Sequence, residues 1–305
     1  MTVPHQVLAT FGVCGVVTAI SPGRNPWRST NTLLVRGDRS LAIRRWEGKQ
    51  AIERMFAEES LLTVLSTTEF RDFAFPIRSL DGRGHVFTSS EVAWTAYELL
   101  TGVSPDALHP ATPQIVGALL AKFHSASAQL SQHNLRSSRL VALPEALTRL
   151  GLVATLLSNV RLFSGLRSLG QAISDNLEEL VILPWGLIHG DFVLENILVS
   201  DRARLVDFEF ARSDLRLFDF AALSAPQRHD NGSFLIASPV FLDRLVESYQ
   251  CTTSSGMQLS AAERRALPLI AAAHWSFVAD DLARAKSRHL PAALDVLCTL
   301  IERLS

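Results

Sequence analysis

Residues 187–210 read Leu-Ile-His-Gly-Asp-Phe-Val-Leu-Glu-Asn-Ile-Leu-Val-Ser-Asp-Arg-Ala-Arg-Leu-Val-Asp-Phe-Glu-Phe, and this stretch decides the fold. Asp191 is followed five positions later by Asn196 and sixteen positions later by Asp207. Apolar runs at 197–199 and 205–206, separated by turn residues, predict two short strands joined by a turn. We expect this hairpin to bring Asn196 and Asp207 side by side, as two oxygen ligands of a small hard cation. Asp191 is then the candidate proton acceptor.

The order of these residues resembles a kinase catalytic loop followed by a metal-binding aspartate. The pattern His-Gly-Asp-x-x-x-x-Asn is similar to that of the aminoglycoside phosphotransferase and type II homoserine kinase-like family, whereas protein kinases have His-Arg-Asp. Glu209 stands where the Asp-Phe-Gly motif of protein kinases has its glycine. The resemblance implies transfer of phosphate from ATP or GTP, with Mg²⁺, to a hydroxyl group of a small molecule.

The same resemblance implies a role for each polar residue of the stretch. Asp191 would orient the acceptor hydroxyl and take its proton, and a loop-capping aspartate is the alternative. Asn196 and Asp207 would bind Mg²⁺. His189 and Asp219 would support the loop from behind, since a buried aspartate between two phenylalanines needs hydrogen-bond donors.

Composition limits the possible partners. The chain has 305 residues and a formal net charge of -1, which gives no reason to expect nucleic acid or a membrane surface as a partner. Three dispersed cysteines favour a reduced, cytoplasmic compartment. The apolar segment 7–20 is too short to span a membrane and lacks a preceding basic residue, so a short helix and a first strand are expected there. The pattern defines no oligomeric state.

Strands and one further helix are expected in the first hundred residues. The pattern predicts a hairpin over 32–43, a helix over 50–65 and a second hairpin that turns at 81–84. A strand over 92–100 follows, and from Pro113 onward the spacing is mostly helical.

These elements, with a Gly- and Pro-containing stretch at 101–110, fit the order that the resemblance implies. We therefore expect an α+β, bilobal, protein-kinase-like fold. Its small antiparallel-sheet N-terminal lobe would comprise residues 1–101, and its larger, mostly helical C-terminal lobe residues 102–305.

A basic residue on the third strand and a glutamate on the small-lobe helix bind nucleotide phosphates in the resembling family. Arg44, where many relatives have lysine, and Glu58 match these positions. Arg45 or Glu59, each one residue away, are alternatives, as is a solvated surface pair.

Other nucleotide contacts are implied by position. Ser29 and Thr30 belong to the segment that would cover the phosphates, although it lacks Gly-x-Gly-x-x-Gly. The main chain around Glu98 and Leu100 would hold the nucleotide base, and an ordinary edge strand would look the same. His124 matches a family histidine that we expect to be packed.

The acceptor is expected against helices between residues 238 and 290. Asp280 or Asp281 could bind an ammonium group, although an exposed pair with Arg284 one turn later is the favoured alternative. Glu209 could approach the metal or the substrate, or pair with an arginine, and lies on the face of Asp207 if the strand continues. Arg212 could pair with a substrate carboxylate.

The leading hypothesis is a kinase that phosphorylates an antibiotic, for resistance or self-resistance. A homoserine- or choline-type metabolite kinase and a nucleotide-binding pseudokinase are the alternatives. The intact set of Asp191, Asn196 and Asp207 argues against the pseudokinase. A protein kinase is disfavoured because no Ala-Pro-Glu follows Asp207.

Overall fold

The computed structural model describes residues 2–14, 18–20, 32–36, 39–128, 139–226 and 234–304, with only the backbone described for 18–20. Contacts along the chain divide it into two compact units. The first comprises Met1–Ser104 and Ile197–Phe210, and the second comprises Pro105–Asn196 and Ala211–Ser305. None of the helices in these ranges combines the length and apolar character needed to cross a lipid bilayer.

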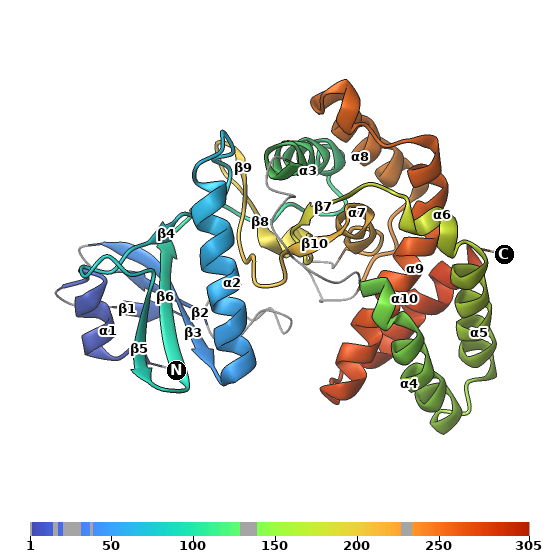
Figure 1. Ribbon diagram of the computed structural model, residues 1–305, viewed down its shortest axis with the longest axis horizontal. Helices are drawn as coiled ribbons and strands as arrows, with labels where there is room; N and C mark the ends of the chain where they lie inside the picture. The colour runs from blue at the N-terminus through green and yellow to red at the C-terminus, as the bar shows by residue number, and fades with distance from the viewer. Residues whose placement is uncertain are drawn as a thin grey trace. The chain divides into compact units, whose positions relative to one another are not determined.

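The first unit is built on an antiparallel sheet (Figure 1). The strands pair in the order β1-β2-β3-β6-β4, and β5 also pairs with β6. Its elements are α1 (His5–Thr10), β1 (Thr18–Ile20), β2 (Thr32–Arg36), β3 (Ser40–Glu47), α2 (Lys49–Leu65), β4 (Pro76–Ile77), β5 (His85–Ser89) and β6 (Val92–Glu98). The predicted hairpin over 32–43 and helix over 50–65 are thus confirmed.

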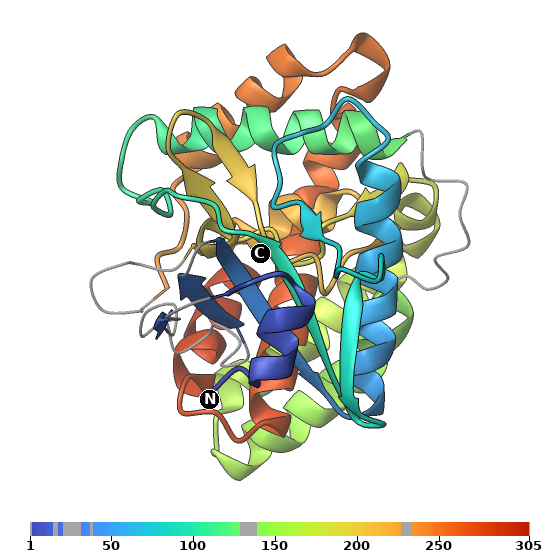
Figure 2. The same cartoon turned by 90° about the vertical axis from the view of Figure 1, so that its left-hand side faces the viewer.

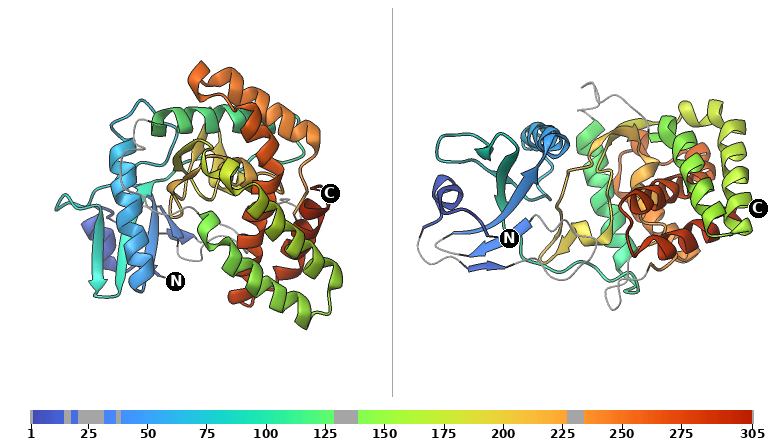
Figure 3. Two further views of the ribbon diagram at one scale, coloured as in Figure 1. Left: turned by 45° about the vertical axis from the view of Figure 1, so that its right-hand side comes forward. Right: turned by 90° about the horizontal axis from the view of Figure 1, so that it is seen from below.

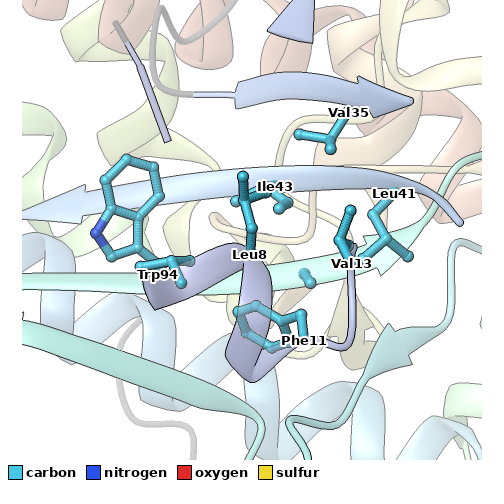
Figure 4. Packing of buried hydrophobic residues seen from close by; sticks show 9 residues of the cluster. Leu8, Phe11, Val13, Val35, Leu41, Ile43 and Trp94 are labelled. Atoms are coloured by element: carbon cyan, nitrogen blue, oxygen red, sulfur yellow. The ribbon is translucent and has the colours of Figure 1, made fainter. Parts of the chain in front are cut away.

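A helix covers each face of this sheet. Leu8 of α1 and Phe11, which follows the helix, pack with Val35, Ile43 and Trp94 from three strands (Figure 4), and Figure 2 shows α1 crossing over the strands. On the opposite face, a second cluster joins residues of β3 and β6 to α2. Alternate β3 residues therefore face α2, and the basic residue Arg44 is among them.

The prediction that the strands on either side of the turn at 81–84 form a hairpin is wrong. A turn is present, where the Ser79 amide donates to the Arg83 carbonyl at 2.7 Å. However, β4 and β5 on either side of it both pair with β6 and not with each other. The hairpin is instead formed by β5 and β6 around residues 90–91. The strand predicted over 92–100 ends at Glu98.

The hairpin β8 (Ile197–Val199) and β9 (Ala203–Leu205) is formed as predicted, with Ile197 opposite Leu205. It packs with the first unit because backbone hydrogen bonds hold both its edges. The Val103 amide donates to the Val199 carbonyl at 3.1 Å, and the Ala74 amide donates to the Leu205 carbonyl at 3.0 Å. The expected boundary at residue 101 would assign this hairpin to the C-terminal lobe, whereas its contacts group it with the first unit.

The second unit is mostly helical (Figure 3). In it α4 packs on α5 and α9, α10 packs on α5 and α9, and α3 packs on α8. Its helices are α3 (Thr112–Ala128), α4 (Leu143–Leu156), α5 (Val160–Asp175), α6 (Leu177–Val181), α7 (Leu217–Ala222), α8 (Pro239–Thr252), α9 (Ala261–Arg284) and α10 (Leu290–Glu302). Short 3₁₀ turns lie at Arg139–Ala142, Leu194–Asn196 and Ser255–Met257.

Two strands of this unit carry the loop that contains Asp191. β7 (Trp185–Ile188) pairs antiparallel with β10 (Arg212–Leu215), and Ile188 lies opposite Arg212. The chain leaves β7 directly into His189-Gly190-Asp191. The start of that loop is therefore attached to a strand that pairs with β10 and packs against α3.

Candidate active site

A buried carboxylate holds the backbone before Asp191. Asp219 of α7 accepts hydrogen bonds from the His189 amide at 2.9 Å, the Gly190 amide at 2.9 Å and His124 Nε2 at 3.1 Å. Gly190 has φ +78°, a conformation that a side chain would strain, so glycine suits this position. The loop backbone is thereby tied to the core of the second unit.

The charge of Asp219 is stabilised despite its burial. Burial alone would raise its pKa, but the hydrogen bond and charge of His124, with His189, hold the pKa below the ordinary aspartate value. His124 Nδ1 lies 3.2 Å from the hydroxyl of Tyr249, which also accepts from Arg216. His124 therefore donates from Nε2 to Asp219, and its Nδ1 shares a hydrogen bond with the Tyr249 hydroxyl. His124 is a packed histidine in this chain of hydrogen bonds.

The loop brings Asp191 and Asn196 together. Asn196 Nδ2 donates to the Asp191 carboxylate at 2.8 Å and to the Asp191 carbonyl at 2.9 Å. Both contacts use the amide nitrogen, so the amide oxygen Oδ1 takes no part in them. Asn196 itself is buried at the end of a 3₁₀ turn.

In the first unit, Arg44 is surrounded by carboxylates. Its Nη1 lies 2.7 Å from Asp207 and 3.7 Å from Glu58, and its Nη2 forms an ion pair with Glu209. The guanidinium also stacks 4.1 Å above the ring of Trp46. The Arg44 side chain is only 6% exposed. Arg44 and Glu58 are thus brought together, with Arg44 making its shorter contacts to Asp207 and Glu209.

The alternatives one residue away form other pairs. Arg45 lies 2.9 Å from Glu47, and Glu59 lies 2.8 Å from His85. Alternation along β3 explains the difference, since Arg44 shares the face of the sheet that packs on α2. Burial raises the pKa of Glu58 to about 7; Arg44 opposes that rise and the nearby charge of Asp207 adds to it.

We expected a continuing strand to place Glu209 on the same face as Asp207. That expectation is wrong, although both residues contact Arg44. β9 ends at Leu205, so no strand alternation continues to 209. Asp207 instead has φ +67°, a left-handed conformation that turns the chain. Of the alternatives for Glu209, pairing with arginine is the one observed, to Arg44 and to Arg54 at 3.1 Å.

The candidate acceptor residues are already paired within the second unit. Asp280 is buried and receives two hydrogen bonds from Arg149, at 2.8 and 2.6 Å, so the expected exposed position of Asp280 is wrong. Asp281 pairs with Arg139 at 3.5 Å and with Arg284. Arg212 Nε donates to the buried Asp214 at 3.0 Å.

The candidate base- and phosphate-binding residues are only partly described. Ser29 and Thr30 lie outside the described residues. The Glu98 amide donates to the Phe75 carbonyl at 2.8 Å and is therefore engaged within the first unit. Leu100 is buried two residues beyond the end of β6.

The donor atoms of Asn196 and Asp207 suit a hard divalent cation. The Asn196 amide oxygen takes no part in the contacts to Asp191, and the Asp207 carboxylate lies 2.7 Å from Arg44 Nη1. An amide oxygen and a carboxylate are oxygen donors of the type that Mg²⁺ prefers. In the described ranges, no three histidine, cysteine, aspartate or glutamate residues gather as a metal-binding group.

Sequence reasoning missed Arg54 and Tyr249. Arg54 precedes Glu58 by four residues on α2, so helical spacing places it one turn away on the same side. That spacing was a usable signal. Tyr249 carries no local signal, because α8 brings it to His124 from 125 residues away.

Fold and site together define the chain as a small-molecule kinase of the protein-kinase-like α+β class, as expected. The sequence model of the phosphotransferase enzyme family matches residues 20–269. The chain therefore belongs to this family. Comparison with curated protein sequences gave no match.

Solved structures share the fold at low sequence identity. The aminoglycoside phosphotransferase from Alicyclobacillus acidocaldarius superposes with a TM-score of 0.68 at 15% identity, covering 99% of this chain and 93% of that one. A microcompartment-associated aminopropanol kinase gives 0.68 at 20% identity, covering 98% and 95%. Amicoumacin kinase hAmiN, solved with AMP-PNP and Ca²⁺, gives 0.65 at 14% identity, covering 95% and 88%.

Proposed function

We propose that the chain transfers the γ-phosphate of ATP or GTP to a small-molecule hydroxyl, with Asp191 as the proton acceptor. The observation that carries the proposal is the pair of hydrogen bonds from Asn196 Nδ2 to Asp191. It holds the carboxylate in one orientation, while Asp219 holds the loop behind it. A positioned carboxylate can orient the attacking hydroxyl and accept its proton.

Asn196 Oδ1 and Asp207 are the proposed ligands of Mg²⁺. When bound, the ion would offset negative charge on the phosphate oxygens. The chain's own contribution is to hold the two donor side chains in place. Asn196 is oriented by its contacts to Asp191, and Asp207 accepts a hydrogen bond from Arg44 at 2.7 Å that holds its carboxylate in place.

The nucleotide is proposed to bind the first unit. The main chain near Glu98 and Leu100 would contact the base, while Ser29 and Thr30 would meet the phosphates. Arg44 and Glu58 are the remaining residues proposed to bind the nucleotide. The buried Arg44–Glu58 pair supports this assignment, because it has the partners that the resembling family places beside phosphate.

For the acceptor we propose an antibiotic that is not a polycation. The structural likeness to antibiotic kinases supports an antibiotic as the acceptor. The pairing of Asp280 and Asp281 with arginines argues against a polycationic antibiotic. Ammonium groups of an aminoglycoside would have to displace these arginines, at a cost in buried ion pairs.

A metabolite kinase for an amino alcohol or a hydroxylated amino acid is the second candidate. The likeness to the aminopropanol kinase favours it, as does the partly buried guanidinium of Arg212 in the second unit. A carboxylate-bearing acceptor would match that charge.

The testing experiment is a screen for acceptor-dependent ADP release with Mg²⁺. The panel contains peptide and nucleoside antibiotics, aminoglycosides, homoserine, choline, aminopropanol and sugars, and Asp191→Ala is the blank. Release with a peptide or nucleoside antibiotic supports the first candidate, and release with homoserine or an amino alcohol supports the second. Nucleotide binding with no release across the panel would favour a pseudokinase.

A further inference from the structure

Exposed apolar side chains gather in one stretch of the second unit. Among the residues that the structure describes, seventeen large apolar side chains are exposed, and ten of them lie between Val141 and Trp185. Single exposed leucines are common on soluble proteins, whereas a contiguous apolar patch marks an interaction surface. The helices of this stretch therefore present a face that a partner could cover.

The first half of this face is formed by α4 and α5, which lie side by side (Figure 1). Each helix turns one side to the core, through residues such as Leu150 and Leu166. A hollow of about 370 Å³ lies between the two helices. The apolar side chains of this half are between 41% and 84% exposed, and they are Leu152, Leu156, Leu157, Val160 and Phe163.

The second half of the face is formed by α6 and the start of β7. A hollow of about 540 Å³ lies between these elements and the two longer helices. Both hollows are lined by Pro144, Leu147 and Gly170, so the two halves are continuous. The exposed apolar side chains of this half are Val141, Leu177, Val181, Ile182 and Trp185. We call the two halves together the α4–α6 face.

The charges at the two ends of the α4–α6 face are opposite in sign. Arg167 lines the first hollow, whereas Glu178 and Glu179 lie between residues that line the second. All three are exposed, and none forms an ion pair with another residue that the structure describes. A two-fold axis through the middle of the face would place each end against the other end of a second copy. Arg167 of each copy would then meet the two glutamates of the other.

The size of the α4–α6 face also suits a second copy. Ten side chains of this kind expose on the order of 600 Å² of apolar surface. A stable interface buries about 800 Å² on each partner, and its polar rim supplies the remainder. An anionic membrane surface fits less well, because it attracts faces rimmed by basic residues and would repel Glu178 and Glu179.

We propose that two copies of this chain associate through the α4–α6 face as a symmetric dimer, in which Arg167 of each copy pairs with Glu178 or Glu179 of the other. Burial of the apolar side chains in and around the two hollows supplies the driving force. The charged pairs fix the relative orientation of the two copies, because the reverse orientation would bring like charges together.

The first test is sedimentation velocity of the full chain over a dilution series, without nucleotide or acceptor. We expect the wild type to be dimeric at about 10 µM. Leu152→Glu places a charge on the face at a side chain that is 64% exposed, and it should raise the Kd for dimerisation at least about tenfold. The matched control is Val240→Glu, the same kind of change at an exposed position of α8, which should keep the wild-type Kd. Circular dichroism and thermal midpoints check that each variant is folded.

The second test exchanges the charges at the two ends of the face. Arg167→Glu alone should raise the Kd at least about tenfold, because glutamates of the two copies would then face one another. Adding Glu178→Arg and Glu179→Arg should return the Kd to within about threefold of wild type, since opposite charges meet again. Loss of folding cannot produce this restoration, because the triple variant carries more changes than the single one.

Three results would overturn the proposal. One is a wild type that stays monomeric up to about 100 µM. Another is a dimer that Leu152→Glu and Arg167→Glu leave unchanged, which would place the contact elsewhere on the surface. The third is a monomeric wild type that binds vesicles of phosphatidylcholine and phosphatidylserine and loses this binding in Leu152→Glu. That result would identify a lipid surface as the partner of the α4–α6 face. A defect in Arg167→Glu that the reversed glutamates do not restore would refute the proposed pairing of the two ends.

Discussion

Asn196 donates both hydrogens of its side-chain amide to Asp191, one to the carboxylate at 2.8 Å and one to the backbone carbonyl at 2.9 Å. The contact spans five residues of one loop and orients both partners at once. The two contacts restrain the carboxylate, and neither of them uses the asparagine oxygen. One short loop thus brings the proposed proton acceptor and a proposed metal ligand into direct contact, while Asp219 holds the backbone before them.

Replacement of Asp191 tests the chemical step. We expect Asp191→Ala to lower kcat by about 10²- to 10⁴-fold, because the attacking hydroxyl loses its positioned proton acceptor. The Kd for AMP-PNP should change little. Steady-state kinetics with the acceptor found in the screen, together with calorimetric titration, measure both quantities. Near-normal turnover with a collapsed nucleotide affinity would contradict the assigned role.

Replacement of Asn196 tests the metal ligand. Asn196→Ala should raise the Mg²⁺ concentration for half-maximal rate and also lower kcat, since the variant loses both an oxygen donor and the contact that orients Asp191. The measurement is a Mg²⁺ titration at saturating nucleotide. If the titration midpoint stays at the wild-type value, Asn196 is not a ligand.

Loss of the Asp219 carboxylate should destabilise the second unit. Asp219→Ala leaves the His189 and Gly190 amides and His124 without their acceptor, and each unsatisfied buried donor costs about 1–3 kcal/mol. We therefore expect a loss of at least about 3 kcal/mol in the free energy of unfolding, measured in urea. Asp295→Ala, at an exposed position of α10, is the control and should change stability by less than about 0.5 kcal/mol.

His274 should make stability sensitive to mild acid. Burial first, then the positive charges of Arg139 and Arg212, lower its pKa to about 3. The folded state thus favours the neutral ring, so this stabilisation is present above pH 6.5 and is lost as pH falls from 6.5 towards 3.

Below pH 6.5 the wild type should lose about 1.4 kcal/mol per pH unit through this residue. His274→Gln should show a correspondingly flatter dependence between pH 6.5 and 5, measured by urea unfolding, while the exposed-site control His5→Gln should follow the wild type. Parallel curves for His274→Gln and the wild type would contradict the assignment.

Gly102 should be intolerant of a side chain. It has φ +144°, and an added Cβ would lie 2.8 Å from the Val199 carbonyl oxygen. We expect Gly102→Ala to destabilise the protein by more than about 1 kcal/mol, because both strain and crowding oppose the methyl group. Gly256→Ala is the matched control, since a Cβ there meets nothing within 4 Å. Equal thermal midpoints for the two variants would sink this prediction.

Local pattern predicted much of the fold. The hairpins over 32–43 and 197–205 and the helix over 50–65 follow from apolar spacing and turn residues, which are properties of neighbouring positions. The turn at 81–84 was placed correctly, but its strands were paired wrongly. Turn chemistry does not specify whether the flanking strands pair with each other or with a third strand such as β6.

Sequence by itself determined the spacing of the proposed catalytic residues Asp191, Asn196 and Asp207, and an arginine at position 44. Tertiary structure decided their partners. Arg44 meets Asp207 and Glu209 across more than 160 positions, and Asp280 is enclosed by an arginine 131 positions away. The physical reason is that spacing encodes contacts within one helix or hairpin, whereas the partner of a buried charge is set by which elements pack together.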